Sequence, residues 1–389
     1  MEKGVWAYPW DLVPDPDCAR RHADMGLTYV CVAARYHAVR ALSYLPDGPH
    51  ITTHRTGRSW LQEAASLSER YAAAGVELDA WIVCFHEDPA PEGQRVVNCF
   101  GDQYPWASCP RHPEARERIL SFVEVAAVTG VFRTLELEAF GFYGFSHGCE
   151  HDKAYALSDP QLVEALSLCC CADCRSATGV EAVQIAQLVR PLLLASLADG
   201  VPPIQSRADG YADALDQILA VEAGARAAHC DDLLAEVMER VRGRARIRLQ
   251  VSPRPRALGA VRPISIPFGT GIPAGDSTLP GLTTPSDSLP DEFVVPVWSS
   301  DPGEVRNDVQ QVLDEVHSWN LERPPNRWRP RPRVLAGFCA IPPFCAPTGI
   351  EQAVETIMSA RPDGLCAYHD GIMHPNARRA YAKALEAQS

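Results

Sequence analysis

The sequence predicts a (β/α)8 TIM barrel, an α/β fold in which eight parallel strands close into a ring. Three observations predict it. Eight short apolar segments recur along the 389 residues, and helix-like segments separate most of them. Several of these helices end in a glycine directly before the next strand. Strands that are apolar on both faces and alternate with helices are typical of a parallel sheet, and eight such units match a barrel.

The first half of the chain supplies four strands, each a short run of apolar residues: VWAYPW (5–10), TYVCVAA (28–34), LDAWIVCF (78–85) and FRTLELEAF (132–140). Between them we expect helices over 15–25, 58–75 and 112–129. These three helices end at Gly26, Gly75 and Gly130, because glycine readily takes the left-handed conformation that stops a helix.

The second half supplies the other four strands: ARIRLQVS (245–252), EFVVPVW (292–298), RVLAGFCAI (333–341) and GLCAYHD (364–370). Helices are expected over 180–199, 208–242, 302–319 and 349–361, with Gly243 ending the second of them. Residues 253–291 are rich in Pro, Gly, Ser and Thr and show no helical period, which predicts a long irregular loop on the catalytic side of the barrel. We expect one domain over residues 1–389. A doubly wound open sheet is the alternative, but no G-x-G-x-x-G follows the first strand.

Composition narrows the class of function. The net charge is −13 and the isoelectric point is near 5.4, which disfavours nucleic acid and anionic membranes as partners. The balance fits a soluble enzyme with an uncharged substrate, and it leaves a homo-oligomer open. The first residues have no apolar signal-peptide core, and no apolar stretch approaches the length of a membrane span, so we expect a cytoplasmic protein. Because cytosol keeps thiols reduced, the 14 cysteines point to metal binding or catalysis rather than disulfides.

A cysteine cluster lies in SLCCCADCRSATG (167–179). Cys169, Cys171 and Cys174 have the spacing Cys-x-Cys-x-x-Cys, which can place three thiolates around one tetrahedral zinc. Cys109, after the third strand and on the same side of the barrel, is the candidate fourth ligand, and Cys170 could replace Cys169. A fortuitous cluster and a redox Cys-x-x-Cys are the alternatives, the second without a thioredoxin-like context. We expect a structural four-thiolate zinc site that joins the loops after strands three and four.

The order of these motifs carries a resemblance. Cys109 is followed by LELEAFG (135–141) and then by the cysteine triplet, and this order resembles the β-galactosidases of glycoside hydrolase family 42. The chain resembles more closely a group of glycosyl-hydrolase-like barrel proteins, through these motifs: WAYPWD (6–11), GDQYP (101–105), HGCEH (147–151) and LCCCADC (168–174). The resemblance implies a zinc-binding cysteine set and an acid/base glutamate, which Glu138 matches.

The fourth strand holds the candidate catalytic carboxylates. Glu136 and Glu138 are two residues apart and therefore point to the same side, while Leu135 and Leu137 point to the helices. We expect both glutamates inside the barrel, with Glu138 nearer the mouth as general acid/base. A like-charged neighbour would raise its pKa, which suits a general acid. The alternative is that one glutamate forms a structural salt bridge with Arg133, Arg35 or Arg248.

A glycosidase needs a second carboxylate at a defined distance from the first. In family 42 the nucleophile is a glutamate at the end of strand seven, but RVLAGFCAIPPF (333–344) contains none. The substitutes are Asp370, Asp301, Glu87 and Asp88, and Asp370 is preferred because it ends strand eight beside His369. Asp301 has the pattern of a helix N-cap, with Pro302 at the first helical position and Glu304 three residues on.

Histidines and aromatic residues gather at the predicted strand ends, where they would contact a sugar. The expected substrate-binding residues are Trp6, Tyr8, Tyr36, His37, His86, Glu136, His147, His151, Trp298 and His369. His147 and His151 could instead hold a second, catalytic metal with a carboxylate. The sequence thus predicts a glycosidase-like enzyme that acts on a sugar or glycoside, with Glu138 and Asp370 as its catalytic pair. A metal-dependent isomerase or lyase and an inactive carbohydrate-binding barrel are the alternatives.

Overall fold

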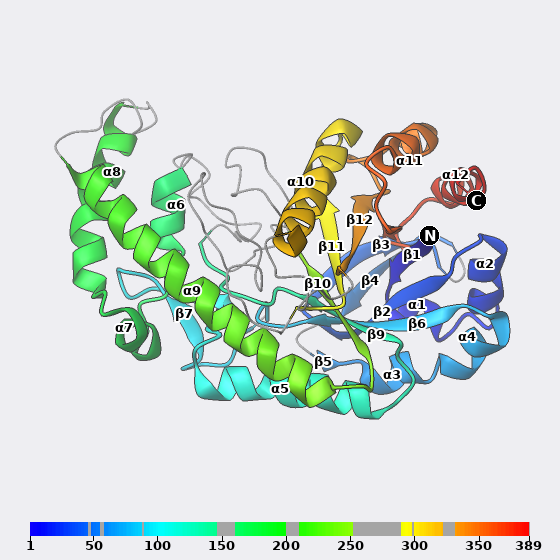
Figure 1. Cartoon of the computed structure of the whole chain (residues 1–389), viewed down its shortest axis with the longest axis horizontal. Helices are drawn as coiled ribbons and strands as arrows, with labels where there is room; N and C mark the ends of the chain where they lie inside the picture. Colours follow the sequence, from blue (N-terminus) through cyan, green and yellow to red (C-terminus); the bar gives the residue numbers. More distant parts are fainter. Residues whose placement is uncertain are drawn as a thin grey trace.

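Eight parallel strands close into a barrel (Figure 1). The computed structural model describes residues 1–45, 48–54, 58–87, 89–145, 160–199, 210–251, 289–297, 299–321 and 331–388. The barrel strands are β1 (Glu2–Ala7), β2 (Tyr29–Tyr36), β6 (Glu77–Val83), β9 (Thr134–Glu138), β10 (Arg246–Gln250), β11 (Glu292–Val297), β12 (Arg333–Cys339) and β13 (Gly364–Tyr368). Each strand is parallel to its neighbours, and β1 pairs with both β2 and β13, which closes the ring. The predicted barrel is confirmed, and every expected strand overlaps an observed one.

Helices cover the outside of the barrel. They are α1 (Pro9–Leu12), α2 (Cys18–Asp24), α3 (Leu61–Ala65), α4 (Ser68–Ala74), α5 (Pro113–Val128), α6 (Pro160–Leu166), α7 (Ala172–Thr178), α8 (Ala182–Asp199), α9 (Tyr211–Val241), α10 (Pro302–Leu321), α11 (Ile350–Met358) and α12 (Pro375–Glu386). The seven expected helical segments are all present, with the segment 58–75 divided into α3 and α4. Gly75 ends α4 with a φ of 70°, as the sequence predicts.

Antiparallel strands decorate the barrel and were not expected from the sequence. β3 (Val39–Ser43) pairs with β4 (His50–His54), β5 (Arg58–Ser59) adds to the edge of β2, and β7 (Arg95–Val97) pairs with β8 (Gln103–Ser108). The β7–β8 hairpin lies between β6 and α5 in the chain and leads directly to Cys109. It therefore builds part of the rim at the carboxyl ends of the strands.

Two apolar cores result from the alternation of side chains along the strands. Leu135 and Leu137 of β9 belong to the core between the barrel and its helices. Trp6 of β1 and Trp81 of β6 point inward and belong to the core of the lumen. The lumen is thus filled largely by aromatic side chains, and polar groups on inward positions are placed among them.

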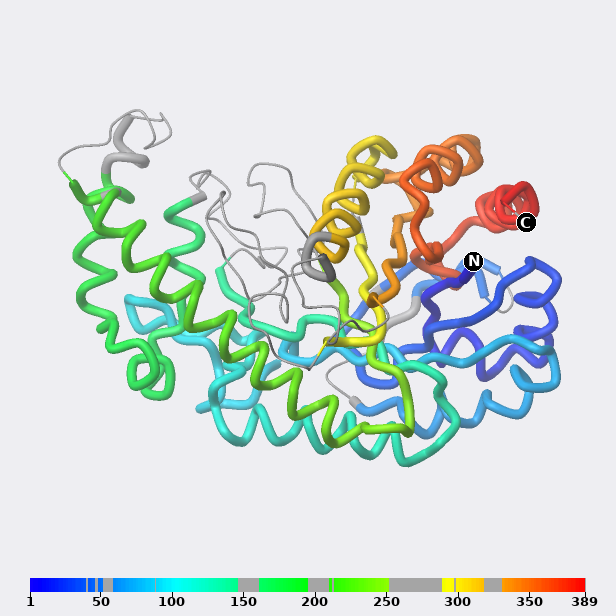
Figure 2. The backbone as a smooth tube through the Cα atoms, in the orientation of Figure 1, coloured from blue at the N-terminus to red at the C-terminus, as the bar shows by residue number. Residues whose placement is uncertain are grey.

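Helices α6, α7 and α8 lie at one end of the long axis of the molecule, and α9 runs from them back along the barrel (Figure 2). Beyond the barrel strands, they form a third apolar core with Leu162, Ile185 and Leu219. Within the described residues, no helix combines the length and apolarity needed to cross a bilayer.

Candidate active site

The floor of the lumen is a network of buried charges around Arg248 of β10. Its guanidinium lies 3.0 Å from Asp79 of β6, 3.0 Å from Glu136 of β9 and 2.6 Å from Glu292 of β11. The four side chains are fully buried, so each charge depends on the others for the solvation it has lost. One arginine thereby joins four strands of the ring.

Glu136 belongs to this floor. Besides Arg248, it accepts hydrogen bonds from Nε1 of Trp6 (2.5 Å) and Nε2 of Gln250 (2.7 Å). These contacts occupy both carboxylate oxygens. The alternative that one glutamate of the fourth strand makes a structural salt bridge with Arg248 is therefore confirmed for Glu136. Trp6 and Glu136, both expected to bind substrate, are engaged with each other in the floor.

Glu138 lies one step further along β9 and has a different environment. It is 4% exposed, and its Oε2 atom accepts a hydrogen bond from Nε1 of Trp81 (2.5 Å). Burial raises the pKa of Glu138 to about 8; the Trp81 hydrogen bond acts to lower it, and the charge of Glu136 raises it further. At neutral pH this carboxyl group is largely protonated, which is the form that a general acid needs.

Three tyrosine hydroxyl groups meet beside Glu138. The hydroxyl of Tyr8 lies 3.2 Å from that of Tyr36 and 3.2 Å from that of Tyr368. Burial raises the pKa of Tyr368 to about 12, and the nearby charge of Glu138 acts in the same direction. The hydroxyl groups stay protonated at neutral pH, so they offer hydrogen bonds without adding charge to the lumen.

His369 follows β13 and packs against these rings. Its ring centroid is 3.7 Å from that of Tyr8 and 6.2 Å from that of Trp81. The imidazole is fully buried, and neither ring nitrogen has a hydrogen-bond partner within the described part of the chain. Burial lowers the pKa of His369 to about 3. A neutral imidazole has one donor and one acceptor, and leaving both unused costs free energy that a polar ligand would recover.

Two further expected histidines lie together at the end of β6. The rings of His37 and His86 are 4.1 Å apart, and His86 stacks on Tyr143 with centroids 5.0 Å apart. Burial lowers the pKa of His37 to about 4, so this side chain is neutral at pH 7. The structure therefore brings Tyr8, Tyr36, His37, His86 and His369 to one lumen with Glu138. His147, His151 and Trp298 lie outside the described residues.

Asp370 does not lie in the lumen with Glu138, contrary to the expectation that the two form a catalytic pair. Its Oδ2 atom is 3.0 Å from Nε2 of His22 and 3.4 Å from Arg21, both on α2, and Nδ1 of His22 is 2.8 Å from the hydroxyl of Tyr71. Burial acts to raise the pKa of Asp370, but His22 and Arg21 outweigh it and hold the pKa well below its usual range. The carboxylate thus joins the end of β13 to the helix layer.

The other substitute carboxylates are also engaged elsewhere. Glu87 forms ion pairs with Arg35 and with Arg118 (2.9 Å for the second) and accepts a hydrogen bond from Ser108. Asp301 caps α10, because its Oδ1 atom accepts a hydrogen bond from the backbone N–H of Gly303 (2.8 Å), which confirms the predicted N-cap. Asp88 lies outside the described residues.

The predicted cysteine ligands meet at the rim. The sulfur atoms of Cys109, Cys169, Cys171 and Cys174 all lie within 4.8 Å of one another. Cys109 is 3.5 Å from Cys174 and 3.7 Å from Cys171, which is too far for a disulfide of about 2.05 Å. Four sulfurs at about 2.3 Å from a tetrahedral zinc would be separated by about 3.8 Å. The four thiols therefore fit a metal ion.

Cys170 is excluded from this set. Its side chain joins the separate core around α6 and α8, and burial raises the pKa of its thiol to about 12. Its backbone N–H donates to the carbonyl of Val97 in β7 (2.6 Å), which turns the neighbouring Cys169 toward the other sulfurs. In the described chain, no other group of three or more His, Cys, Asp and Glu side chains gathers closely enough to hold a metal.

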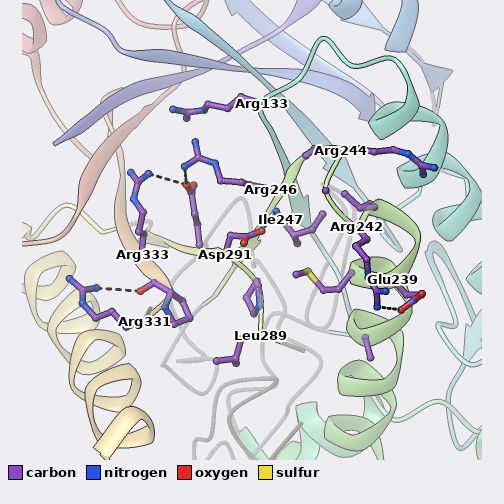
Figure 3. Close-up of a pocket in the computed structure, with 18 residues that line it drawn as sticks. Arg133, Glu239, Arg242, Arg244, Arg246, Ile247, Leu289, Asp291, Arg331 and Arg333 are labelled. Atoms are coloured by element: carbon purple, nitrogen blue, oxygen red, sulfur yellow. Dashed lines mark hydrogen bonds and ion pairs between the residues drawn. The ribbon is translucent and has the colours of Figure 1, made fainter. Parts of the chain in front are cut away.

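A cavity of about 1040 Å³ lies at the opposite, amino-terminal ends of β9–β12 (Figure 3). Six arginines line it: Arg133, Arg242, Arg244, Arg246, Arg331 and Arg333. Most of them already have acidic partners. Arg246 and Arg333 both contact Glu292 (3.1 and 3.2 Å), and Arg331 contacts Asp363 (2.7 Å). Active sites of TIM barrels lie at the carboxyl ends of the strands, so this cavity is on the stability side of the fold.

Two residues of the site escaped the sequence analysis as site residues, namely Trp81 and Tyr368. Both occupy inward positions near the ends of their strands, and their signal is an aromatic residue in phase with Glu138 or the end of the eighth strand. Burial of an indole requires a partner for its N–H, and Glu138 is that partner.

No protein-family model matches the chain, and no curated protein matches it. Among solved structures, it is similar to the glycoside hydrolase domain of PgaB (BpsB) from Bordetella bronchiseptica, with 15% sequence identity, a TM-score of 0.50 and 98% of each chain covered. It is also similar to the catalytic domain of a beta-amylase from Paenibacillus polymyxa, with 10% identity and a TM-score of 0.52 over 100% of this chain and 98% of that one. At such identities the likeness shows the fold: this chain has the TIM barrel found in these glycoside hydrolases.

Proposed function

We propose that the chain is a glycosidase-like enzyme in which Glu138 is the general acid/base. One observation carries the proposal: Glu138 is a buried carboxyl group with a pKa of about 8 at the carboxyl end of a barrel strand, surrounded by aromatic side chains. Its neighbour Glu136 is held in the floor by Arg248 and does not compete for this role. Raised carboxyl pKa values of this kind are how glycosidases keep an acid protonated near neutral pH.

The proposed step is acid-assisted cleavage of a glycosidic bond. Protonated Glu138 gives its proton to the glycosidic oxygen as the bond from that oxygen to the anomeric carbon breaks. The departing sugar leaves as an alcohol. Water then supplies a hydroxyl group to the anomeric carbon and returns its proton to the Glu138 carboxylate. Because only the protonated acid starts this cycle, the rate should fall as the pH rises through the pKa of about 8.

We assign substrate binding to the polar groups that face the same lumen, which are Tyr8, Tyr36, His37, His86 and His369. Support comes from His369, whose buried ring nitrogens have no protein partner in the described chain and match the donors and acceptors of a sugar hydroxyl. The neutral histidines and tyrosines favour an uncharged carbohydrate. His147, His151 and Trp298 remain predicted contacts. We assign Asp370 a positioning role, since it fixes the turn that presents His369.

The resemblance to family 42 also supports a zinc ion at Cys109, Cys169, Cys171 and Cys174. A four-thiolate site has no open position, so its role would be structural. Cys109 follows the β7–β8 hairpin and Cys171 precedes α7, so an ion held there would fasten two rim segments together. The catalytic-metal alternative depends on His147 and His151, and the described residues offer no observation in its favour.

A cytoplasmic location and the absence of nucleic-acid and membrane partners stay predictions of the sequence.

Turnover of a panel of neutral aryl glycosides and oligosaccharides tests the proposal. Glu138→Gln keeps the shape of the side chain and removes its proton, so cleavage should fall by about two to four orders of magnitude. Glu315→Gln is the matched control, because Glu315 is another carboxyl group with a raised pKa but lies on α10, outside the barrel. Unchanged cleavage by Glu138→Gln would refute the acid assignment. Sugar binding without any turnover in the unmodified chain would favour the binding-barrel alternative.

A further inference from the structure

Helices α8 and α9 form an antiparallel pair at the end of the molecule remote from the last barrel strands (Figure 1). Each helix buries one apolar stripe against the other and against α6. Ile185, Val189 and Leu192 of α8 pack with Leu215 and Leu219 of α9 in this core. These contacts account for one face of each helix.

Both helices carry a second apolar surface that the described chain does not cover. On α8, Val183 is 59% exposed and Leu194 is 63% exposed. On α9, Ala214, Ile218 and Val221 follow the helical spacing of four and three residues, and Val221 is 52% exposed. A helix of a monomer normally turns one apolar stripe to the core and polar residues to water, so a second stripe indicates a further contact.

A groove of about 420 Å³ runs between the two helices within this surface. Its lining contains no charged side chain: Val180, Gln184, Gln187, Leu188, Ala214, Gln217, Ile218 and Val221. Apolar residues alternate there with side-chain amides. We call this groove, together with Val183 and Leu194, the α8–α9 face.

We propose that the α8–α9 face binds the same face of a second copy of this chain, so that two helix pairs form a four-helix contact around a two-fold axis. Charge points to a second copy as the occupant. Two chains of net charge −13 repel each other over most of their surface, and an uncharged patch is where they can approach. Charged residues are likewise depleted at the centres of protein interfaces.

The amides supply a second reason. Gln184, Gln187 and Gln217 each offer donors and an acceptor, so they can pair with the same amides of an identical face. A two-fold contact requires this self-complementarity, because the same patch is presented by both partners. A partner with a charged face would instead leave its charges opposite apolar side chains.

Sedimentation of the full chain over a wide concentration range tests the proposal. The unmodified chain should be a dimer that dissociates on dilution. Val221→Arg places a charge on both sides of the two-fold contact and should weaken association more than tenfold. Val125→Arg is the matched control, because Val125 is a 55% exposed valine on α5, outside the face, and this variant should dimerise normally. Circular dichroism and thermal melting establish that each variant is folded, with Gln217→Arg as a second variant in the face.

Mixing two variants tests whether the face meets itself. Val221→Arg and Val221→Asp should each be monomeric alone and should associate when mixed, since opposite charges then face each other. A chain that is monomeric at every concentration would overturn the proposal and leave the face to a different protein. A Val221→Arg dimer as tight as that of the unmodified chain would also overturn it, because the contact would then lie elsewhere.

Discussion

The two glutamates of β9 show how neighbouring positions on one strand acquire different chemistry. Glu136 receives Trp6, Gln250 and Arg248, so its charge is matched within the floor. Glu138 has the Trp81 indole as its donor, and burial raises its pKa to about 8. The cation at the floor of the lumen therefore decides which of the two carboxyl groups keeps a proton.

The raised pKa of Glu138 predicts a pH-dependent cost of folding. This carboxyl group ionises near 4.5 in the unfolded chain and near 8 in the folded one, so its contribution makes the free energy of unfolding fall as the pH rises between these values. The slope is at most about 1.4 kcal/mol per pH unit. Glu138→Gln removes this group, so the variant should gain stability over the unmodified chain between pH 5 and pH 8, measured by denaturant unfolding. An equal difference at both pH values would show that Glu138 is ionised normally.

At the scale of elements, Asp370 joins a barrel strand to its helices. His22 and Arg21 of α2 bind its carboxylate, and Tyr71 of α4 binds His22 in turn. This contact stabilises the fold above the unfolded pKa of 3.8 and is lost as the pH falls toward the lower folded value.

Asp370→Asn should therefore destabilise the chain by about 3 kcal/mol at pH 7, because it leaves a buried pair incomplete. Asp17→Asn, which alters an exposed pair with Arg20, should change stability by less than about 1 kcal/mol. Thermal and denaturant unfolding measure both effects. Unchanged stability together with loss of glycoside cleavage would instead place Asp370 in the catalytic machinery.

The cysteine site makes a separate prediction about two adjacent residues. Cys169 lies among the four clustered sulfurs, whereas Cys170 packs in the core of α6 and α8. Metal analysis of the purified chain should find one zinc per chain, retained in Cys170→Ser and lost or greatly weakened in Cys169→Ser. Loss of zinc should also lower the melting temperature, because binding energy of a structural ion is folding energy. Equal metal content in both variants would contradict the ligand set.

Sequence patterns predict these elements unequally well. Runs such as LDAWIVCF (78–85) and RVLAGFCAI (333–341) are apolar on both faces, and this property alone locates buried strands. The β3–β4 and β7–β8 hairpins escape, because their short polar strands resemble loops. Asp370 is misplaced because inward and outward positions alternate only within the strand. Beyond Tyr368, His369 also faces the lumen, so Asp370 turns outward.

Across the whole molecule, the barrel is closed by apolar packing outside and by one charge network inside. Arg248 contacts carboxylates from β6, β9 and β11, which are neighbours of its own strand or one strand further. The sequence names Arg248 only as one of three candidate partners, because the pairing follows from ring closure and not from local spacing. Glu138 and the cysteines were predictable since strand phase and metal-ligand spacing are local properties.

Arg248→Met should destabilise the whole barrel rather than one edge of it. The change leaves Asp79, Glu136 and Glu292 buried with like charges and without their shared cation, and such a loss costs about 3–5 kcal/mol. Denaturant unfolding followed by two probes, far-ultraviolet and aromatic circular dichroism, should show one shared shift of the transition. A variant as stable as the unmodified chain would mean that the network is not needed to close the ring.

The most direct test of the central claim is the titration of Glu138 itself. Carbon-13 NMR of a chain labelled at the glutamate carboxyl carbons, compared with the same spectrum of Glu138→Gln, identifies its signal. The account predicts a midpoint near the pKa of about 8 for that signal. A midpoint near the ordinary glutamate pKa of 4.5 would show an ionised carboxylate at neutral pH and would contradict the assignment of Glu138 as the acid.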